Sequence, residues 1–434
     1  MAFDIQFKLI YQGIRDVFRV RSLSHMISSQ RLQQQLAVLE KITAPGRGIN
    51  RLAFTDADWQ GRAYLMGLMR EAGMELREDA FGNVIGHVQG ADESLPAVMF
   101  GSHGDSVPEG GNFDGIVGIL AAIETVRSMR EDGFTPKRPL EVVLFLCEES
   151  SRFSAATLGS RAMRGELSHE DLMRLHDKEG HTLYEVLKGR SLDPDHIESA
   201  RYTKPLRAFL ELHIEQGKVL EHEGLPIGLV TGIAAPTRFY VHIHGSADHS
   251  GATPMNLRHD GLCAAAEVVL AVEREASSYT ESPVVGTVGV LEVTPGAMNV
   301  IPGEVRLGVD LRSTSGKAKD AVEQAVRQDI ASIAEKRQLA YDIEPVSKEE
   351  PARMDAALVG LLEDTAKELA LPYRRMMSGA GHDSMHWADY APTAMIFIPC
   401  RAGISHNPAE HAELANIVRG TELLSAAVRK LVSE

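Results

Sequence analysis

The feature that most constrains the fold is an apolar run that ends in two adjacent glutamates. Residues 140–147 are apolar at all but one position, and Glu148 and Glu149 follow directly. Residues 209–213 and 393–398 form similar apolar runs. A strand with almost no polar face is typical of a sheet that is covered by helices on both sides. We therefore expect an α/β fold.

Segments with helical periodicity alternate with these runs. Residues 55–71 are predicted to form a helix, with Thr55 or Asp56 as its N-cap. Residues 115–130 place their apolar side chains on one stripe, which also indicates a helix. Two shorter strands are predicted at residues 84–88 and 97–102, and a last helix from residue 414 onward.

The pattern changes between about residues 236 and 346. The predicted order there is strand, helix, strand, strand, helix, strand, which is a split βαβ arrangement. These elements cover residues 239–244, 258–276, 284–293, 304–311, 317–337 and 341–344. We expect residues 26–235 and 347–434 to form one catalytic domain, with residues 236–346 as a domain inserted into it.

The first 25 residues fit neither pattern. Apolar residues precede Arg15, Arg19 and Arg21, but no small-residue cleavage site follows a long apolar core. The stretch Ser24-His25-Met26 is typical of a cloning junction, and a natural amphipathic extension is the alternative. Residues 1–25 are therefore treated as an extension outside the fold.

Composition excludes several classes of partner. The 434 residues include 45 Lys and Arg against 60 Asp and Glu, a net charge of −15, which disfavours nucleic acid and anionic membranes. No apolar run approaches the ~18 residues of a membrane span. The three cysteines are too few and too scattered for a disulfide framework, so we expect reduced thiols in a cytoplasmic protein.

The strongest chemical signal is a glycine-rich segment after the strand predicted at residues 97–102. It contains His103 and Asp105, and Asp114 follows at the start of the next predicted helix. Ligands bind beyond the carboxyl ends of strands in such sheets, and Asp105 is spaced to hold the second ring nitrogen of His103. Asp114 could bridge two cations. The alternatives are a surface or core histidine and an aspartate that only caps a helix.

The adjacent glutamates are a second signal. Two carboxylates at the end of an apolar strand are costly unless they are paired or bound to metal. Neighbouring side chains differ in direction, so one could bind metal while the other acts as a base beside a metal-bound water. Adjacency does not assign the two roles, and a pair of loop glutamates near Arg152 is the alternative.

Two further histidines complete a plausible set of metal ligands. His213 ends a predicted strand, and His406 lies in a loop before the last helix. Three imidazoles and two carboxylates suit divalent zinc, manganese, cobalt or nickel, and one bridging aspartate would complete a site for two divalent metal ions. The candidate ligands are His103, Asp114, Glu149, His213 and His406.

Eight short motifs follow one another from about residue 28 to the end of the chain. They are GSHGD at 101–105, GGNFDG at 110–115, EESSRF at 148–153, ELHIEQG at 211–217, HSGATPM at 249–255, MNVIPG at 298–303, SGAGHD at 378–383 and GISHNP at 403–408. In this order they resemble the dinuclear-metal amidohydrolases related to aminoacylases and carboxypeptidases. The branch that they resemble most contains N-carbamoyl-L-amino-acid hydrolases, β-ureidopropionases and allantoate amidohydrolases.

The resemblance implies a metallopeptidase-like catalytic domain with a central mixed sheet, and an inserted βαββαβ domain that acts as lid and dimerisation surface. It implies that the five candidate ligands hold two metal ions, with Asp114 as the bridge. Glu148 would be the general base, with Asp105 beside it in the catalytic group, and His249 from the partner of a homodimer would stabilise the oxyanion. The implied substrate-binding residues are Gln216, Asn299 and Arg312, and the role of His382 and Asp383 stays open.

The implied reaction is hydrolysis of the carbamoyl C–N bond of an N-carbamoyl-L-amino acid. Allantoate or ureidoglycolate hydrolysis and β-ureidopropionase activity are alternatives, because the motifs do not fix the ureido substrate. A binding protein that had lost the chemistry is the alternative outside this class. Such a protein would be expected to lack Glu148 or one of the ligands, and none is missing.

Overall fold

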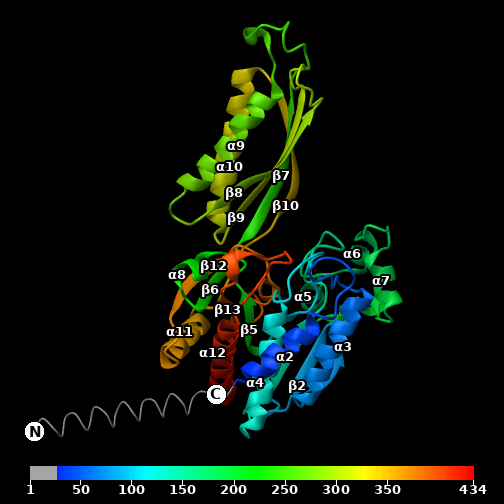
Figure 1. Ribbon diagram of the computed structural model, residues 1–434, viewed down its shortest axis with the longest axis vertical. Helices are drawn as coiled ribbons and strands as arrows, with labels where there is room; N and C mark the ends of the chain where they lie inside the picture. Colours follow the sequence, from blue (N-terminus) through cyan, green and yellow to red (C-terminus); the bar gives the residue numbers. More distant parts are fainter. Residues whose placement is uncertain (1–26) are drawn as a thin grey trace, which may run out of the picture. The chain divides into compact units, whose positions relative to one another are not determined.

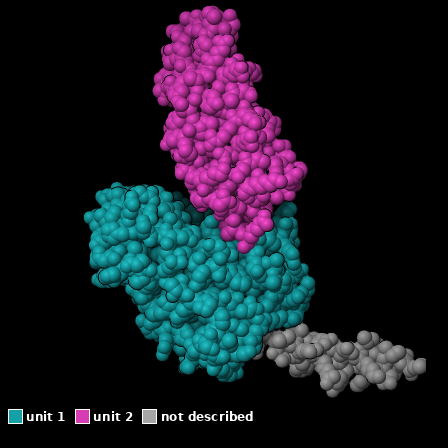
Figure 2. Space-filling model, turned by 180° about the vertical axis from the view of Figure 1, so that it is seen from behind, with its two compact units in different colours: residues 1–231, 354–376, 382–434 teal, residues 232–353, 377–381 magenta. Residues whose placement is uncertain are grey.

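The chain forms two compact units (Figure 2) in a computed structural model that describes residues 27–434. Within these residues, unit 1 comprises residues 27–231, 354–376 and 382–434. Unit 2 comprises residues 232–353 and 377–381. The extension predicted at residues 1–25 lies outside the described residues, and the roles of lid and dimerisation domain stay predictions.

Unit 1 is built on a mixed sheet with the strand order β1-β2-β4-β3-β5-β13-β6-β11, and β12 pairs with β6. The central strands β4, β3, β5 and β13 run parallel, whereas β2 and β6 pair antiparallel with the outer two of them. The central strands are β3 (Ala97–His103), β4 (Leu140–Phe145), β5 (Leu206–Ile214) and β13 (Thr393–Ile398). The others are β1 (Glu75–Glu78), β2 (Val84–Val88), β6 (Ile227–Ile233), β11 (Ala352–Arg353) and β12 (Tyr373–Ser378).

Both faces of this sheet are covered, so that β3, β4 and β13 are buried at every position, as their apolar sequences predict (Figure 1). α4 and α12 pack on the central strands, with α2 and α11 beside them. A core cluster of buried residues includes several aromatic rings, and the ring centroids of Phe209 and Trp387 lie 5.3 Å apart in a stacked arrangement. These helices are α2 (Ser29–Leu39), α4 (Ile116–Glu131), α11 (Ala356–Glu368) and α12 (Leu414–Ser433).

The remaining helices of unit 1 are mostly short, and only α3 was expected from the sequence. α3 is capped by Thr55, whose side chain accepts from the amide of Asp58, as predicted. Within residues 27–434, no helix combines the length and the apolar character needed to cross a membrane. The helices are α3 (Asp56–Glu71), α5 (Leu158–Arg164), α6 (His169–Arg174), α7 (Leu183–Gly189) and α8 (Val219–Glu223), with 3-10 turns at Pro194–Ala200, Asp383–His386 and Arg401–Gly403.

Unit 2 has an antiparallel sheet of strand order β10-β7-β9-β8, and α9 and α10 pack against it. The order of strands and helices along the chain is the one predicted. Alternate residues of β7 and β9 face the helices, and Phe239, Val241 and Leu307 lie in the resulting core. The elements are β7 (Ala235–His244), α9 (Gly261–Ser278), β8 (Val285–Thr294), β9 (Glu304–Ser313), α10 (Gly316–Arg337) and β10 (Ala340–Lys348), with a 3-10 turn at Met255–Leu257.

Several predicted boundaries differ from the structure by a few residues, and two of these differences have a clear local reason. The strand predicted at residues 140–147 ends at Phe145, because Cys147 has a positive φ of 61° that cannot continue a strand. The helix predicted at residues 258–276 begins at Gly261, because the Asp260 carboxylate accepts from the first free amides and caps it. The early end of β4 redirects the chain immediately before Glu148.

Gly101 allows β3 and β4 to lie side by side, since a Cβ there would come within 1.9 Å of the Val143 carbonyl oxygen. We predict that Gly101→Ala lowers the free energy of unfolding by about 1–3 kcal/mol or more, because overpacked backbone must shift. Gly67 is the control. It lies in α3 with open space around its Cα, so Gly67→Ala should stabilise by about 0.5–1 kcal/mol. Urea unfolding measures both, and equal stability of the two variants would contradict the prediction.

Candidate metal centre

The segments that carry the predicted ligands all follow the carboxyl ends of the parallel strands. β3 ends at His103, which pairs with Phe145 at the end of β4, two peptide bonds before the Cys147 turn. His213 pairs with Phe397 near the ends of β5 and β13. Glu149 follows β4 and His406 follows β13. The topology therefore brings all five candidate ligands to one edge of the sheet.

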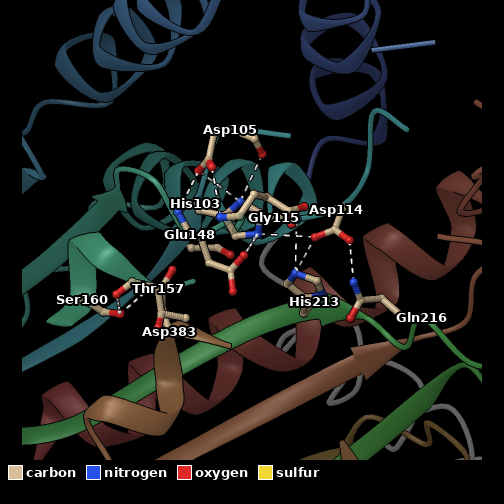
Figure 3. A network of polar contacts seen from close by, with 12 residues as sticks. His103, Asp105, Asp114, Gly115, Glu148, Thr157, Ser160, His213, Gln216 and Asp383 are labelled. Atoms are coloured by element: carbon tan, nitrogen blue, oxygen red, sulfur yellow. Dashed lines mark hydrogen bonds and ion pairs between the residues drawn. The ribbon is translucent and has the colours of Figure 1, made fainter. Parts of the chain in front are cut away.

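Asp114 belongs to both groups of candidate ligands, and Figure 3 shows it beside His213 and Gln216. Its Oδ1 is 3.3 Å from His103 Nε2 and 3.0 Å from His213 Nε2. Its Oδ2 is 3.5 Å from His406 Nε2, which in turn lies 3.4 Å from Glu149 Oε1. Two groups of three ligand atoms result, each with its atoms within 4.8 Å of one another, and the two groups share Asp114.

Asp114 does not cap the following helix. The N-cap position of α4 belongs to Gly115, and no side chain makes a cap hydrogen bond there. The Asp114 side chain instead faces the three imidazoles. The alternative of a capping aspartate is thereby excluded.

The two buried imidazoles turn Nε2 towards Asp114. Nδ1 of His103 lies 3.2 Å from the main-chain oxygen of Asp105, and Nδ1 of His213 lies 2.9 Å from that of Ile214. With each Nδ1 beside a carbonyl, Nε2 is the ring nitrogen that faces Asp114, where it either carries a proton or binds a cation. A lone pair that faces a carboxylate oxygen needs a proton or a cation between them. This donor set therefore fits divalent cations that bind nitrogen and oxygen.

Burial sets the electrostatics of the ligands. Burial opposes the charge of Asp114, but the imidazoles of His213, His103 and His406 outweigh it and hold the pKa of Asp114 well below its usual range. Burial and the charge of Asp114 raise the pKa of Glu149 to about 7. Two carboxylates thus compete for positive charge in one small volume, and cations would relieve that competition.

The two adjacent glutamates have different surroundings. Glu149 belongs to one of the two ligand groups, whereas Glu148 belongs to neither and its Oε2 lies 3.9 Å from His103 Nε2. Burial raises the pKa of Glu148 well above its usual value, with His103 opposing the shift and Glu149 adding to it. Arg152 does not pair with either glutamate, because it pairs with Asp177 at 3.1 Å and donates to the Ala53 carbonyl.

Asp105 supports the glutamates more closely than the imidazole. Its two carboxylate oxygens accept from the amides of Glu148 and Glu149, at 3.2 and 3.1 Å. The carboxylate lies 3.6 Å from His103 Nδ1, so the nearer acceptor for that ring nitrogen is the Asp105 carbonyl. Asp105 therefore connects the segment that follows β3 to the segment that follows β4 through hydrogen bonds.

Gln216 and the pair His382–Asp383 also reach this edge of the sheet. Nε2 of Gln216 donates to Asp114 Oδ2 at 2.6 Å and lies 3.4 Å from His406 Nε2. The buried His382 ring meets the His213 ring edge-on, with centroids 4.5 Å apart. Asp383 accepts from the Ser160 hydroxyl at 2.5 Å, and burial with the charge of Glu211 raises its pKa to about 8.

The predicted residues His249, Asn299 and Arg312 belong to unit 2, whereas the ligands belong to unit 1. His249 and Asn299 are exposed neighbours, since the amide of Ser250 donates to the Asn299 carbonyl at 3.1 Å. Arg312 lies at the other end of β9, where it pairs with Asp310 at 2.9 Å and donates to the Gly379 carbonyl. The nine residues of strand from Glu304 to Arg312 span about 27 Å.

Two buried glutamates at the site were not predicted. Glu211 accepts from the hydroxyls of Ser102 and Ser384, at 2.8 and 2.6 Å. Glu211 lies two residues before His213 on β5. Because side chains alternate between the two faces of a strand, the sequence could have placed both on the same face. Glu410 accepts from the amides of residues 113 and 114. No local pattern in the loop after His406 indicated that contact.

We predict that divalent ions stabilise the folded protein through Asp114. Zn²⁺ or Mn²⁺ at 100 times its dissociation constant should add about 2.7 kcal/mol of stability and raise Tm. Asp114→Asn should abolish the shift because it removes the charge shared by both ligand groups. Asp364→Asn is the control, since Asp364 is exposed and pairs only with Lys367 in the described contacts. A full metal-induced shift in Asp114→Asn, measured by differential scanning calorimetry, would contradict the assignment.

Comparison with known proteins identifies the family of this chain. Residues 99–430 match peptidase family M20/M25/M40. An N-carbamoyl-L-amino acid amidohydrolase from Geobacillus stearothermophilus is 40% identical over 408 residues, which cover 94% of this chain and 99% of that protein. A ureidoglycolate hydrolase from Oryza sativa subsp. japonica is 38% identical over 411 residues, which cover 93% of this chain and 85% of that protein.

A solved structure is also similar over nearly the whole length of the chain. The amidase of the hydantoinase/carbamoylase family from Burkholderia multivorans superposes with a TM-score of 0.88 at 36% identity, covering 95% of this chain and 99% of that one. The resemblance inferred from the motifs is confirmed, and so is the mixed-sheet fold with its second domain. The protein is thus a hydrolase of carbon–nitrogen bonds other than peptide bonds, and the chain belongs to peptidase family M20/M25/M40.

Proposed function

We propose that this protein hydrolyses the carbamoyl C–N bond of N-carbamoyl-L-amino acids, giving the amino acid, carbon dioxide and ammonia. The observation that carries the proposal is the Asp114 carboxylate, which is shared by two ligand groups beside a glutamate that belongs to neither. The relative from Geobacillus stearothermophilus supports the substrate class. Ureidoglycolate is the second candidate, because the relative from Oryza sativa subsp. japonica is similar to nearly the same degree.

Two divalent ions, of zinc, manganese, cobalt or nickel, would be held by the five candidate ligands and would supply a Lewis acid for the ureido carbonyl and an activated water. Glu148 is suited to be the general base because its carboxylate is buried, lies outside both ligand groups and has a raised pKa. Its carboxylate would take a proton from the attacking water and return it to the departing nitrogen. Asp105 fixes the main chain that carries this carboxylate.

We propose that the working form is a homodimer in which His249 of one subunit stabilises the oxyanion in the site of the other. His249 pairs with Val300 before β9 begins, whereas Arg312 lies near the far end of β9, and this arrangement supports the proposal. A small ureido substrate is much shorter than the strand between them, so one molecule cannot touch both residues of a single unit 2. A second copy of the chain would supply the missing group.

The substrate is tested by ammonia release from the metal-loaded enzyme. The panel comprises N-carbamoyl-L-amino acids, their D enantiomers, N-carbamoyl-β-alanine, allantoate and ureidoglycolate. The proposal predicts the highest kcat/KM for an N-carbamoyl-L-amino acid. A higher value for allantoate, ureidoglycolate or N-carbamoyl-β-alanine would replace the proposed substrate with that compound.

Substitution of the adjacent glutamates separates base from ligand. Glu148→Gln preserves the shape of the side chain, so we expect both ions to stay bound while kcat falls by about 10²–10⁴ through the loss of proton transfer. Glu149→Ala should lower metal content and activity together. Metal loss in Glu148→Gln with retention in Glu149→Ala would reverse the two roles. The measurements are metal stoichiometry by elemental analysis and kcat.

Subunit mixing tests the position of His249. Homodimers of His249→Ala and homodimers of Glu148→Gln should each be inactive. A mixed dimer has one intact site if His249 acts across the interface, because the Glu148 of one subunit then meets the His249 of the other. Random exchange of subunits should then restore about a quarter of the wild-type rate. No restoration, despite mixed dimers detected by native mass spectrometry, would place His249 and Glu148 in the same chain's site or remove His249 from the reaction.

A further inference from the structure

Glu410 joins the two loops that carry Asp114 and His406. Its Oε1 accepts from the amides of Phe113 and Asp114, at 2.9 and 3.1 Å, across 296 residues of sequence in the second case. Its Oε2 lies 2.9 Å from the hydroxyl of Ser405, the residue before His406. The same hydroxyl lies 2.9 Å from Asp114 Oδ2. One carboxylate thus fixes the main chain next to two candidate ligands from different parts of the sequence.

The Glu410 side chain is buried and packs closely against Gly111. Glu410 is only 5% exposed. A Cβ at Gly111 would lie 2.2 Å from Glu410 Oε1 and 2.3 Å from its Cβ, so the two loops meet only because residue 111 is glycine. The turn that contains Glu410 closes without its side chain, because the Glu410 amide donates to the Asn407 carbonyl at 3.0 Å. The carboxylate therefore serves the contact between the loops, not the local turn.

We propose that Glu410 is a positioning residue that sets the separation of Asp114 and His406, and thereby the affinity for the ion held by Asp114, Glu149 and His406. The proposal rests on the proposed function, because that function requires an ion at this group. Residues that orient metal ligands typically change metal affinity by about 10- to 100-fold when they are substituted. His103 and His213 lie on strands β3 and β5, so the other ligand group depends less on Glu410.

Two variants disturb the contact in different ways. Glu410→Gln keeps the shape of the side chain but removes the charge that accepts from two amides and a hydroxyl. Gly111→Ala keeps that charge and displaces the carboxylate from the amides by steric contact. Glu413→Gln is the matched control, because Glu413 follows three residues later and pairs at the surface with Arg401 and His411. Ser405→Ala tests the same contact if Glu410→Gln fails to fold.

The experiment is calorimetric titration of metal-free protein with Zn²⁺, with His406→Ala to identify the isotherm that belongs to the His406 group. We expect Glu410→Gln and Gly111→Ala to weaken that isotherm by about 10- to 100-fold and to affect the other less. Glu410→Gln should also leave Tm of the metal-free protein close to that of the control, whereas the steric overlap in Gly111→Ala should lower it. If wild-type protein binds two ions and both variants bind them with wild-type affinity, the role of Glu410 is overturned while the proposed function stands. If Glu410→Gln weakens both isotherms equally and also lowers Tm, Glu410 has only a structural role and the proposal for Glu410 is overturned. If the wild-type protein binds no ion, the proposed function itself is overturned.

Discussion

The contact between the Asp114 carboxylate and three imidazoles is the interaction on which the rest of the site depends. A buried carboxylate is costly unless positive charge or hydrogen bonds compensate it. Here His103 and His213 face one oxygen and His406 faces the other. This arrangement divides the candidate ligands into two groups around one shared side chain, and it is the reason for proposing two cations and not one.

The sheet provides these ligands because four neighbouring strands run parallel. Parallel strands end at the same edge, so segments separated by more than a hundred residues deliver polar side chains to one place. Two further carboxylates, which belong to neither group of candidate ligands, then accept hydrogen bonds from the main chain of the loops that carry those groups. Asp105 accepts from the amides of Glu148 and Glu149, and Glu410 accepts from the amide of Asp114. Backbone amides cannot rotate away as side chains can, so these contacts hold the ligand-bearing loops firmly.

Strong local patterns made much of this predictable. The apolar runs identified β4, β5 and β13, and the alternating pattern of unit 2 identified the order of its strands and helices. The grouping of the five candidate ligands was predictable because each follows an apolar strand or a glycine-rich turn. Adjacency predicted that Glu148 and Glu149 point in different directions but could not assign their roles, because their surroundings depend on the positive φ of Cys147 and on the contacts of Asp105. Glu410 and the distance from His249 to Arg312 depend on tertiary contacts and sheet register, which no short pattern contains.

The most direct test of the central claim is anomalous X-ray diffraction from crystals grown with Zn²⁺ or Mn²⁺, recorded on both sides of the metal absorption edge. The account predicts two anomalous peaks in each subunit. One should lie among His103, Asp114 and His213, the other among Asp114, Glu149 and His406, with Asp114 contacting both. A single peak, or two peaks that do not share Asp114, would contradict it.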